Sequence, residues 1–212
     1  MNTLSRRRFA VLTAVSVLSA AALAAPIPAA AEPVVGSPAP TFSGTDTKGQ
    51  KVNLADYLGK TVILEWTNHD CPYVKKHYES DNMQAMQRSY TDDDVVWLSI
   101  ISSAPGKQGY VSPDEAIQLT NGRQASPSHV LFDPEGTVGK QYSAETTPHM
   151  YIIDPEQVLR YAGAIDSIRS TKQSDIAKAI NYVKEGMAAL GEGQLVDPKL
   201  TKAYGCSIKY KS

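Results

Sequence analysis

The chain has 212 residues, of which 42% are hydrophobic and 20% are charged. This composition excludes a collagen-like, low-complexity or wholly disordered protein. The 21 basic and 22 acidic residues give a formal net charge of -1, without the basic surplus typical of proteins that bind nucleic acid through phosphate contacts. The 2 cysteines are too few for a disulfide scaffold or a four-cysteine zinc site, and the length suggests one domain with extensions.

Residues 1–31 have the features of an export signal. Arginines at 6–8 precede an apolar run over 9–25, and small residues at 29–31 suit cleavage. The run is at the lower limit for a membrane span, so an uncleaved anchor is the alternative. The stretch SRRRF at 5–9 resembles the twin-arginine signal, which implies export of a folded protein from a bacterial cytoplasm. We expect a periplasmic or secreted protein, free of the membrane after cleavage, in a compartment where two thiols can pair.

Predicted strands and helices alternate along the rest of the chain. Strands are predicted over 52–54, 61–66, 95–101, 129–132, 150–153 and 158–162, and helices over 72–90, 113–122 and 174–190. Ser112 and Glu115 can form a capping box at the start of the second helix. The order predicts one α/β domain over 32–190 with parallel early strands and an antiparallel last pair, followed by a tail over 191–212.

Cys71 is the first candidate for chemistry. It follows a predicted buried strand and Pro72 opens the next helix, so the cysteine lies at or near the helix N-cap. Free N–H groups and the positive end of the helix dipole favour a thiolate at such a position. Lys75 and Lys76 could strengthen this effect or point to solvent, and Asp70 opposes it. The alternative is a buried structural cysteine.

A set of segments along the chain forms a distinctive combination. They are GSPAPTF at 36–42, Gly49, LGKTVIL at 58–64, Trp66, Cys71-Pro72, and Thr147-Pro148 followed by the apolar strand 150–153. Together they resemble the thioredoxin-like superfamily, and within it the alkyl hydroperoxide reductase/thiol-specific antioxidant (peroxiredoxin-like) branch. The resemblance implies an α/β thioredoxin-like fold, with a central mixed sheet flanked by helices, a short N-terminal extension and a C-terminal tail.

The resemblance also implies how a partner would be bound. Pro148 is expected to be cis, and the backbone at Thr147 is expected to face Cys71 and to bind a thiol partner in extended form. Pro72 and Thr67 are the other candidates for substrate contact. Two departures affect the expected activity: Val74 occupies the position of the second cysteine in Cys-x-x-Cys, and the peroxide-binding Pro-x-x-x-Thr-x-x-Cys pattern is absent. Thr67 could replace its threonine only in a longer loop.

Glu65 and Cys206 complete the candidate catalytic residues. Glu65 interrupts an apolar strand at the position where thioredoxins carry a buried acid, and a buried carboxyl group can carry a proton for a thiol. An outward-facing or ion-paired glutamate is the alternative. Cys206 lies in the tail, which is long enough to fold back so that this thiol attacks a sulfenic acid or mixed disulfide at Cys71. A permanent Cys71–Cys206 disulfide and intermolecular pairing are the alternatives.

These residues predict an exported thiol–disulfide oxidoreductase in which Cys71 is the nucleophile and Cys206 resolves it. Its partners would be protein thiols or disulfides together with an unknown reductant protein. A peroxiredoxin-like thiol peroxidase is the first alternative, because the motif contains a single cysteine. A non-catalytic module that binds a metal or a partner is the second. A metal site of Cys71, His69 and His149 matches no familiar zinc or copper spacing, so we expect no metal and no cofactor.

Overall fold

The computed structural model describes residues 33–212, so the predicted export signal lies outside the described residues. The main sheet consists of β1 (Ser43–Asp46), β2 (Lys51–Asn53), β3 (Val62–Trp66), β4 (Val96–Ile101), β5 (His129–Phe132), β7 (His149–Ile153) and β8 (Leu159–Gly163). Their spatial order is β2-β1-β5-β4-β3-β7-β8. Strands β3, β4 and β5 are parallel, whereas β7 runs antiparallel to β3 and β8. The earliest predicted strand, β2, is not parallel as expected: it pairs antiparallel with β1, which is antiparallel to β5, because a tight turn joins β1 and β2. The predicted mixed sheet is therefore confirmed.

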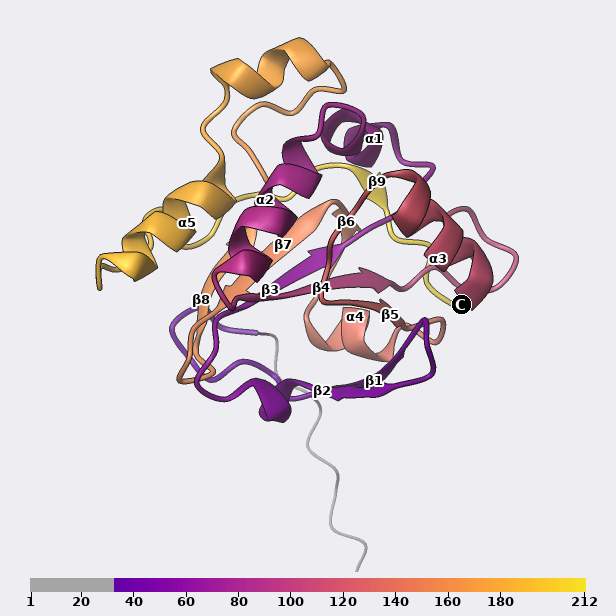
Figure 1. Ribbon diagram of the computed structural model, residues 1–212, viewed down its shortest axis with the longest axis horizontal. Helices are drawn as coiled ribbons and strands as arrows, with labels where there is room; N and C mark the ends of the chain where they lie inside the picture. The colour runs from indigo at the N-terminus through magenta and orange to yellow at the C-terminus, as the bar shows by residue number, and fades with distance from the viewer. Residues whose placement is uncertain (1–32) are drawn as a thin grey trace, which may run out of the picture.

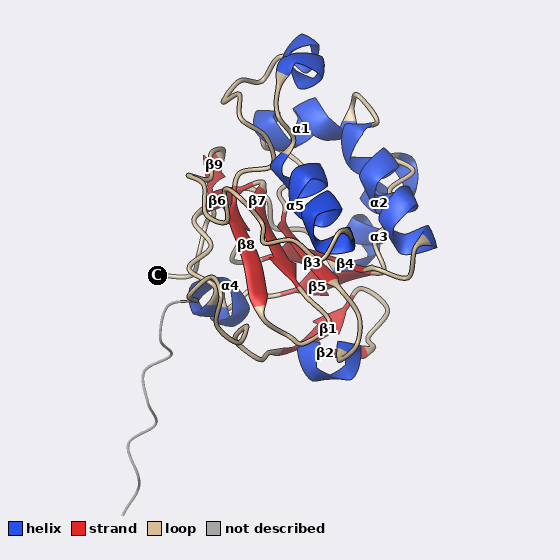
Figure 2. Ribbon diagram, turned by 90° about the vertical axis from the view of Figure 1, so that its left-hand side faces the viewer, coloured by secondary structure: helices blue, strands red, loops and turns tan. Residues whose placement is uncertain are grey.

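Helices cover both faces of this sheet (Figures 1 and 2). The helices are α1 (Pro72–Tyr78), α2 (Asn82–Asp92), α3 (Pro113–Gly122), α4 (Thr137–Gln141) and α5 (Tyr182–Gly191), with short 3-10 turns at η1 (Leu54–Tyr57) and η2 (Gln173–Lys178). Helix α4 lies on one face, and α1, α2, α3 and α5 lie on the other (Figure 2). Within residues 33–212, no helix has the length and apolar character that a membrane crossing needs.

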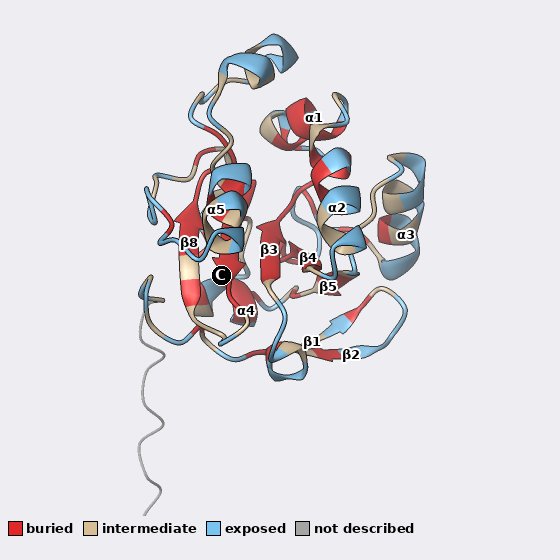
Figure 3. Cartoon of the chain, turned by 60° about the vertical axis from the view of Figure 1, so that its left-hand side comes forward, coloured by how far each residue is buried: buried red, intermediate tan, exposed pale blue. Residues whose placement is uncertain are grey.

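The central strand β3 is buried on both faces, and its side chains divide between two hydrophobic clusters. Leu64 and Trp66 pack with Tyr142 on the α4 side. Ile63 points the opposite way, into a cluster that also holds Cys71. This alternation is the period-two geometry of a strand, and it explains why β3 reads as an apolar run with no polar face. Figure 3 shows the buried sheet between helices whose outer surfaces are exposed.

Two predicted helices are each divided in the structure. The helix expected over 72–90 is α1 and α2, because Asp81 takes a left-handed conformation (φ 59°) that ends regular helix between them. The helix expected over 174–190 is η2 followed by α5. Asn181 begins α5 by accepting hydrogen bonds from the first-turn amides, which caps a new helix. Helix α4 was not predicted, whereas the capping box of Ser112 and Glu115 is confirmed.

The C-terminal tail folds back along the domain, as the sequence allowed. Leu200 forms a bridge with Ala162 of β8. Further on, strand β9 (Cys206–Ser207) pairs antiparallel with β6 (Thr146–Thr147) in a separate two-stranded sheet. In Figure 1 this yellow segment passes from α5 to the edge where α1 begins. The tail therefore carries the second cysteine to the helix start that carries the first.

Candidate active site

Cys71 is the N-cap residue of α1, as predicted, with Pro72 in the first turn of the helix. Its side chain is fully buried. The sulfur makes no cap hydrogen bond with the helix amides. Instead, the Cys71 Sγ donates to the carbonyl oxygen of Thr147 at 3.1 Å. The helix start fixes the cysteine backbone, and the thiol itself is directed towards the Thr147-Pro148 segment.

Thr147 lies between the two cysteine-bearing segments. Its peptide bond to Pro148 is cis, which confirms the expectation drawn from the resemblance. Thr147 is paired with Cys206 in the β6–β9 ladder, and its hydroxyl donates to the Cys206 carbonyl at 3.4 Å. Because Thr147 also accepts the Cys71 thiol, a single residue contacts both predicted catalytic cysteines. The structure thus brings Cys71, Cys206, Thr147 and Pro148 together.

Cys206 is half-buried, and both cysteines carry free thiols. Burial raises the pKa of the Cys206 thiol to about 12, and its hydrogen bond and charge interaction with Cys71 act in the same direction. Cys206 is therefore protonated at neutral pH and is a poor first nucleophile, because the thiolate is the reactive form. This favours Cys71 as the residue that reacts first.

Gly205 allows the close approach of the tail to Thr147. Its φ is +147°, and a Cβ at this position would lie 1.9 Å from the Thr147 carbonyl oxygen. No side chain fits at that distance, so any other residue would force β9 away from β6. The contact between β9 and Thr147, which sets the position of Cys206, therefore requires glycine at position 205.

Glu65 is fully buried on the same side of β3 as Cys71, so it does not face outward. Its carboxylate accepts hydrogen bonds from Tyr78 OH at 2.9 and 3.1 Å, Gln87 Nε2 at 3.2 Å, Trp97 Nε1 at 2.9 Å and Ser99 Oγ at 3.0 Å. All four donors are neutral, and no ion pair or hydrogen bond links Glu65 to Cys71 within the described part of the chain. Tyr78 ends α1, so Glu65 also fastens this helix to the sheet.

Thr67 lies between β3 and Cys71, next to a small cavity with a mixed polar and apolar lining. The cavity has a volume of about 20 Å³ and is lined in part by Thr67, Asn68 and Ser99. The Thr67 hydroxyl and the Asn68 side-chain nitrogen are buried and have no hydrogen-bond partner among residues 33–212. This volume is enough for one water molecule. The structure therefore places Thr67 near the site, while the Cys71 sulfur is directed to Thr147 instead.

The hypothetical metal site of Cys71, His69 and His149 is not formed. Within residues 33–212, no group of three or more His, Cys, Asp or Glu side chains is placed to hold a metal ion. Burial lowers the pKa of His149 to about 4. Its Nδ1 accepts from the Glu145 amide at 3.3 Å, so the ring already has a structural hydrogen bond. His69 instead lies 3.4 Å from the Asp70 carboxylate near the surface.

The sequence identifies neither Asp166 nor Tyr204, and it identifies Lys76 only as a charge that could favour the Cys71 thiolate. Lys75 is exposed, but the Lys76 side chain is buried and its Nζ lies 2.9 Å from Asp166 Oδ2. The Tyr204 hydroxyl donates a hydrogen bond to the same carboxylate. The partners are separated by 90 and 38 positions in the chain, so no local spacing could have revealed them.

The sequence matches the AhpC/TSA family over residues 35–162. No curated protein gives a significant match to the chain. Among solved structures, an uncharacterized conserved protein of Geobacillus kaustophilus is 26% identical, with a TM-score of 0.73 over 84% of this chain and 93% of that one. A hypothetical protein of Sinorhizobium meliloti is 20% identical, with a TM-score of 0.71 over 84% and 96%.

A candidate thiol:disulfide interchange protein, DsbE, of Chlorobium tepidum is also similar to the chain. It is 21% identical, with a TM-score of 0.50 over 62% of this chain and 85% of that one. At this identity the likeness concerns the fold. The architecture is thus thioredoxin-like, as the sequence resemblance implied.

Proposed function

Because the chain belongs to the AhpC/TSA family of thioredoxin-like proteins, we propose that it is an exported thiol–disulfide oxidoreductase with Cys71 as nucleophile and Cys206 as resolving thiol. One observation carries the proposal. Thr147 accepts the Cys71 thiol and pairs with the backbone of Cys206, so one residue contacts both cysteines, and the Cys206 thiol itself interacts with Cys71. A second cysteine supplied by the tail replaces the one that Val74 excludes from the helix start.

In the first step, the Cys71 thiolate attacks one sulfur of a partner's disulfide. A mixed disulfide forms at Cys71, and the other partner sulfur leaves as a thiolate that takes up a proton. The N-cap position of Cys71 is near the positive end of α1, and we propose that this end favours the attacking anion once the sulfur leaves the Thr147 carbonyl. Thr147, Pro148, Thr67 and Pro72 are the proposed contacts for the partner around this sulfur.

In the second step, Cys206 attacks the Cys71 sulfur of the mixed disulfide. The negative charge of a Cys71 thiolate is one cause of the raised pKa of Cys206. When Cys71 is bonded to a partner sulfur, this charge is gone. The Cys206 thiol then loses its proton more readily, forms the Cys71–Cys206 disulfide and releases the second partner thiol. Overall, two thiols of this chain are oxidised and one partner disulfide is reduced. Glu65 is proposed to accept the Cys206 proton, and a reductant protein with two thiols restores the starting state.

A peroxiredoxin-like thiol peroxidase is the second candidate function, and the small cavity beside the Thr67 hydroxyl, which lacks a partner among the described residues, favours it. A hydroperoxide would convert the Cys71 thiolate to a sulfenate with release of water or an alcohol, and Cys206 would then displace water from the sulfenic acid. Stopped-flow mixing with hydrogen peroxide separates the two functions. Thiolate consumption no faster than that of free cysteine would exclude the peroxidase.

The proposal is tested by trapping the mixed disulfide. Reduced Cys206→Ser protein is mixed with a disulfide-bonded peptide, and the products are mapped by mass spectrometry. We expect a stable adduct at Cys71 with this variant, no adduct with Cys71→Ser, and a Cys71–Cys206 disulfide with the unaltered chain. Equal adduct yields at the two cysteines, or none at Cys71, would contradict the assignment of the nucleophile.

Export is proposed from the segment 1–31. The N-terminal sequence of the protein recovered from the periplasm or medium should begin at Glu32. Replacing Arg6 and Arg7 with lysine should keep the precursor in the cytoplasm if the twin-arginine route is used. A full-length protein retained in the membrane would instead support the uncleaved anchor.

A further inference from the structure

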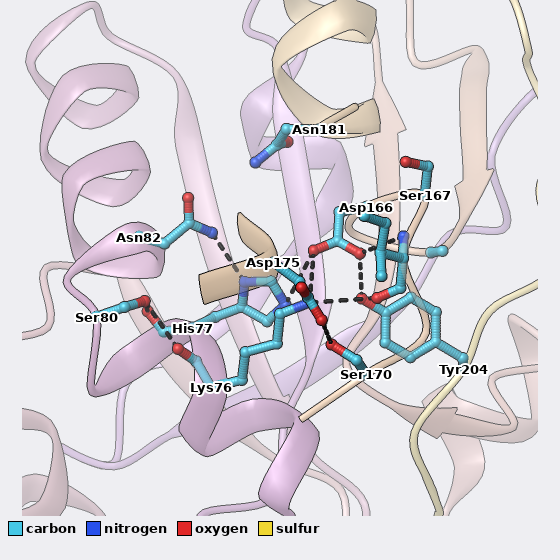
Figure 4. Close-up of polar contacts among 12 residues, drawn as sticks. Lys76, His77, Ser80, Asn82, Asp166, Ser167, Ser170, Asp175, Asn181 and Tyr204 are labelled. Atoms are coloured by element: carbon cyan, nitrogen blue, oxygen red, sulfur yellow. Dashed lines mark hydrogen bonds and ion pairs between the residues drawn. The ribbon is translucent and has the colours of Figure 1, made fainter. Parts of the chain in front are cut away.

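Asp166 is the centre of a buried polar cluster that includes Lys76 and Tyr204 (Figure 4). Lys76 Nζ lies 2.9 Å from Asp166 Oδ2 and also donates to the Ile168 carbonyl at 3.2 Å. The other carboxylate oxygen, Oδ1, accepts from the Tyr204 hydroxyl and from the Ile168 amide. Asp166 is 3% exposed and Lys76 1% exposed. A buried ion pair with every oxygen bonded is rigid, and removing one member is costly.

The cluster joins the two segments that carry the sulfurs. Lys76 follows Cys71 in α1, and Tyr204 is two residues before Cys206 in the tail. The Tyr204 ring also packs edge-on against Tyr73 of α1, with ring centroids 5.6 Å apart. Helix α1 and the tail therefore meet at Asp166 in addition to their contacts at Thr147.

His77 is the remaining titratable group that faces the carboxylate. Its Nε2 lies 3.7 Å from Asp166 Oδ2, beyond hydrogen-bond distance, and its Nδ1 lies 2.9 Å from Asn82 Nδ2. Burial lowers the pKa of His77 to about 4, so this ring is neutral at physiological pH. Lys76 thus neutralises Asp166, and Tyr204 adds a hydrogen bond to a charged acceptor.

A hydrogen bond to a charged partner is stronger than a single neutral hydrogen bond, such as the one that the Ile208 amide donates to the Glu145 carbonyl at 2.9 Å. Strand β9 spans Cys206–Ser207 only, and the bond from Thr147 Oγ1 to the Cys206 carbonyl is long at 3.4 Å. Charge-assisted hydrogen bonds are shorter and roughly twice as strong as neutral ones. Loss of the Tyr204 hydroxyl should therefore loosen the tail more than loss of any other single bond near Cys206.

We propose that Asp166 and Tyr204 are positioning residues that hold Cys206 against Cys71 and limit access to both sulfurs. The proposal deepens the proposed function, on which it rests. Cys71 has no exposed surface while the tail is in place, so an external partner reaches this sulfur when the Tyr204–Cys206 segment withdraws. Release of the Tyr204 hydroxyl from Asp166 is the step that permits this withdrawal.

The test compares Tyr204→Phe with Tyr210→Phe in the reduced full-length protein. Both changes remove one phenol hydroxyl from the same tail, but Tyr210 donates to the Ala144 carbonyl at 2.6 Å, away from Asp166. The measured quantity is the alkylation rate of each cysteine with iodoacetamide near neutral pH, followed by peptide mapping. We expect Tyr204→Phe to label Cys206 and Cys71 about tenfold faster than the unaltered chain, since a tenfold change corresponds to about 1.4 kcal/mol. In Tyr210→Phe, the alkylation rates of both cysteines should stay within about twofold of those in the unaltered chain.

The pH profile distinguishes release of the tail from general loosening. In the docked tail, the raised pKa of Cys206 makes its labelling rise steadily up to about pH 12. A released tail has a thiol with the ordinary pKa of about 8.5, so the Tyr204→Phe profile should gain a component that levels off near that pH. Equal labelling of the two variants, or global loss of helical circular dichroism in Tyr204→Phe, would overturn the proposal.

A redox titration of the same proteins separates this proposal from the proposed function. Glutathione disulfide supplies the oxidant: it accepts two electrons and two protons from the thiols of Cys71 and Cys206 and becomes two glutathione molecules. If the unaltered chain forms no Cys71–Cys206 bond while Tyr204→Phe is labelled tenfold faster, the positioning role stands and the proposed function fails. If the bond forms but labelling is unchanged, the positioning role fails alone. Asp166→Asn should show the same faster labelling in its folded fraction.

Discussion

The two cysteines face each other but are held by very different parts of the molecule. Cys71 follows a strand in the middle of the sheet and starts a helix that is packed onto it. Cys206 lies in a tail that contacts the domain through a two-residue strand, a bridge at Leu200, further backbone and side-chain hydrogen bonds, and the buried side chains of Tyr204 and Ile208. Elements with many buried contacts open only with the whole domain, whereas segments with few contacts open locally. We therefore expect the segment around Cys206 to open more readily than the region around Cys71.

The largest expected effect comes from breaking the buried ion pair between these two regions. Lys76→Met leaves Asp166 charged and unpaired in the interior, and such a loss typically destabilises a protein by about 3–5 kcal/mol. Chemical denaturation measures the free energy of unfolding. The matched control is Lys60→Met, whose partner Asp94 is 79% exposed, so the expected change is below about 1 kcal/mol. Equal effects of the two changes would show that Asp166 does not depend on Lys76.

Acid should destabilise the Cys71 region through its buried histidines. Burial lowers the pKa of His77 and His149 to about 4. Between the ordinary value of about 6.5 and this value, the unfolded chain binds protons that the folded chain excludes, so stability falls as the pH falls through that window. At about pH 4, each histidine should have lowered the free energy of unfolding by on the order of 3 kcal/mol. Between pH 6.5 and 4, the free energy of unfolding should fall less steeply in His149→Gln than in the unaltered chain. His69→Gln should show the same pH dependence as the unaltered chain.

Glu65→Gln tests whether the buried carboxylate serves the chemistry in addition to the packing of α1. The substitution keeps the shape but removes an ionisable group and one acceptor oxygen. We expect about 1–3 kcal/mol of destabilisation from the donors left unpaired. We also expect closure of the Cys71–Cys206 disulfide to slow by about tenfold, with an altered pH–rate profile. Ser99→Ala removes one donor and keeps the carboxylate, so it is the control. An unchanged pH–rate profile in Glu65→Gln would show that Glu65 has a structural role only.

The smallest effect on overall stability is expected in the tail. Gly205→Ala places a methyl group against the Thr147 carbonyl and should displace β9, while Gly193→Ala, at a φ of +69°, adds a methyl group to open space. Because β9 can move away locally, both changes should lower the free energy of unfolding by only about 1–2 kcal/mol. Only Gly205→Ala should increase alkylation of Cys206, by several-fold. Similar labelling of the two variants would show that Gly205 does not set the position of the cysteine.

The sequence predicted the Cys71 region better than the Cys206 region, for a physical reason. An apolar run, a Cys-Pro pair and a capping box are local signals, since strand burial and helix initiation depend on neighbouring residues. The breaks at Asp81 and Asn181 were missed because a left-handed residue or a cap can lie inside a helical pattern. The tail depends on pairs distant in sequence, such as Tyr204 with Asp166, which no local pattern encodes. That Cys206 can return to Cys71 was predicted from the tail's length, but its anchoring was not.

The most direct test of the central claim is equilibration of the full-length protein in glutathione buffers of graded redox ratio, followed by peptide mapping of the bridged cysteines. We expect an intramolecular Cys71–Cys206 disulfide that forms and is reduced reversibly, with an effective thiol concentration of millimolar or higher because the tail holds the two groups together. A protein that instead collects glutathione separately on Cys71 and Cys206 across the whole range would contradict the pairing of nucleophile and resolving thiol.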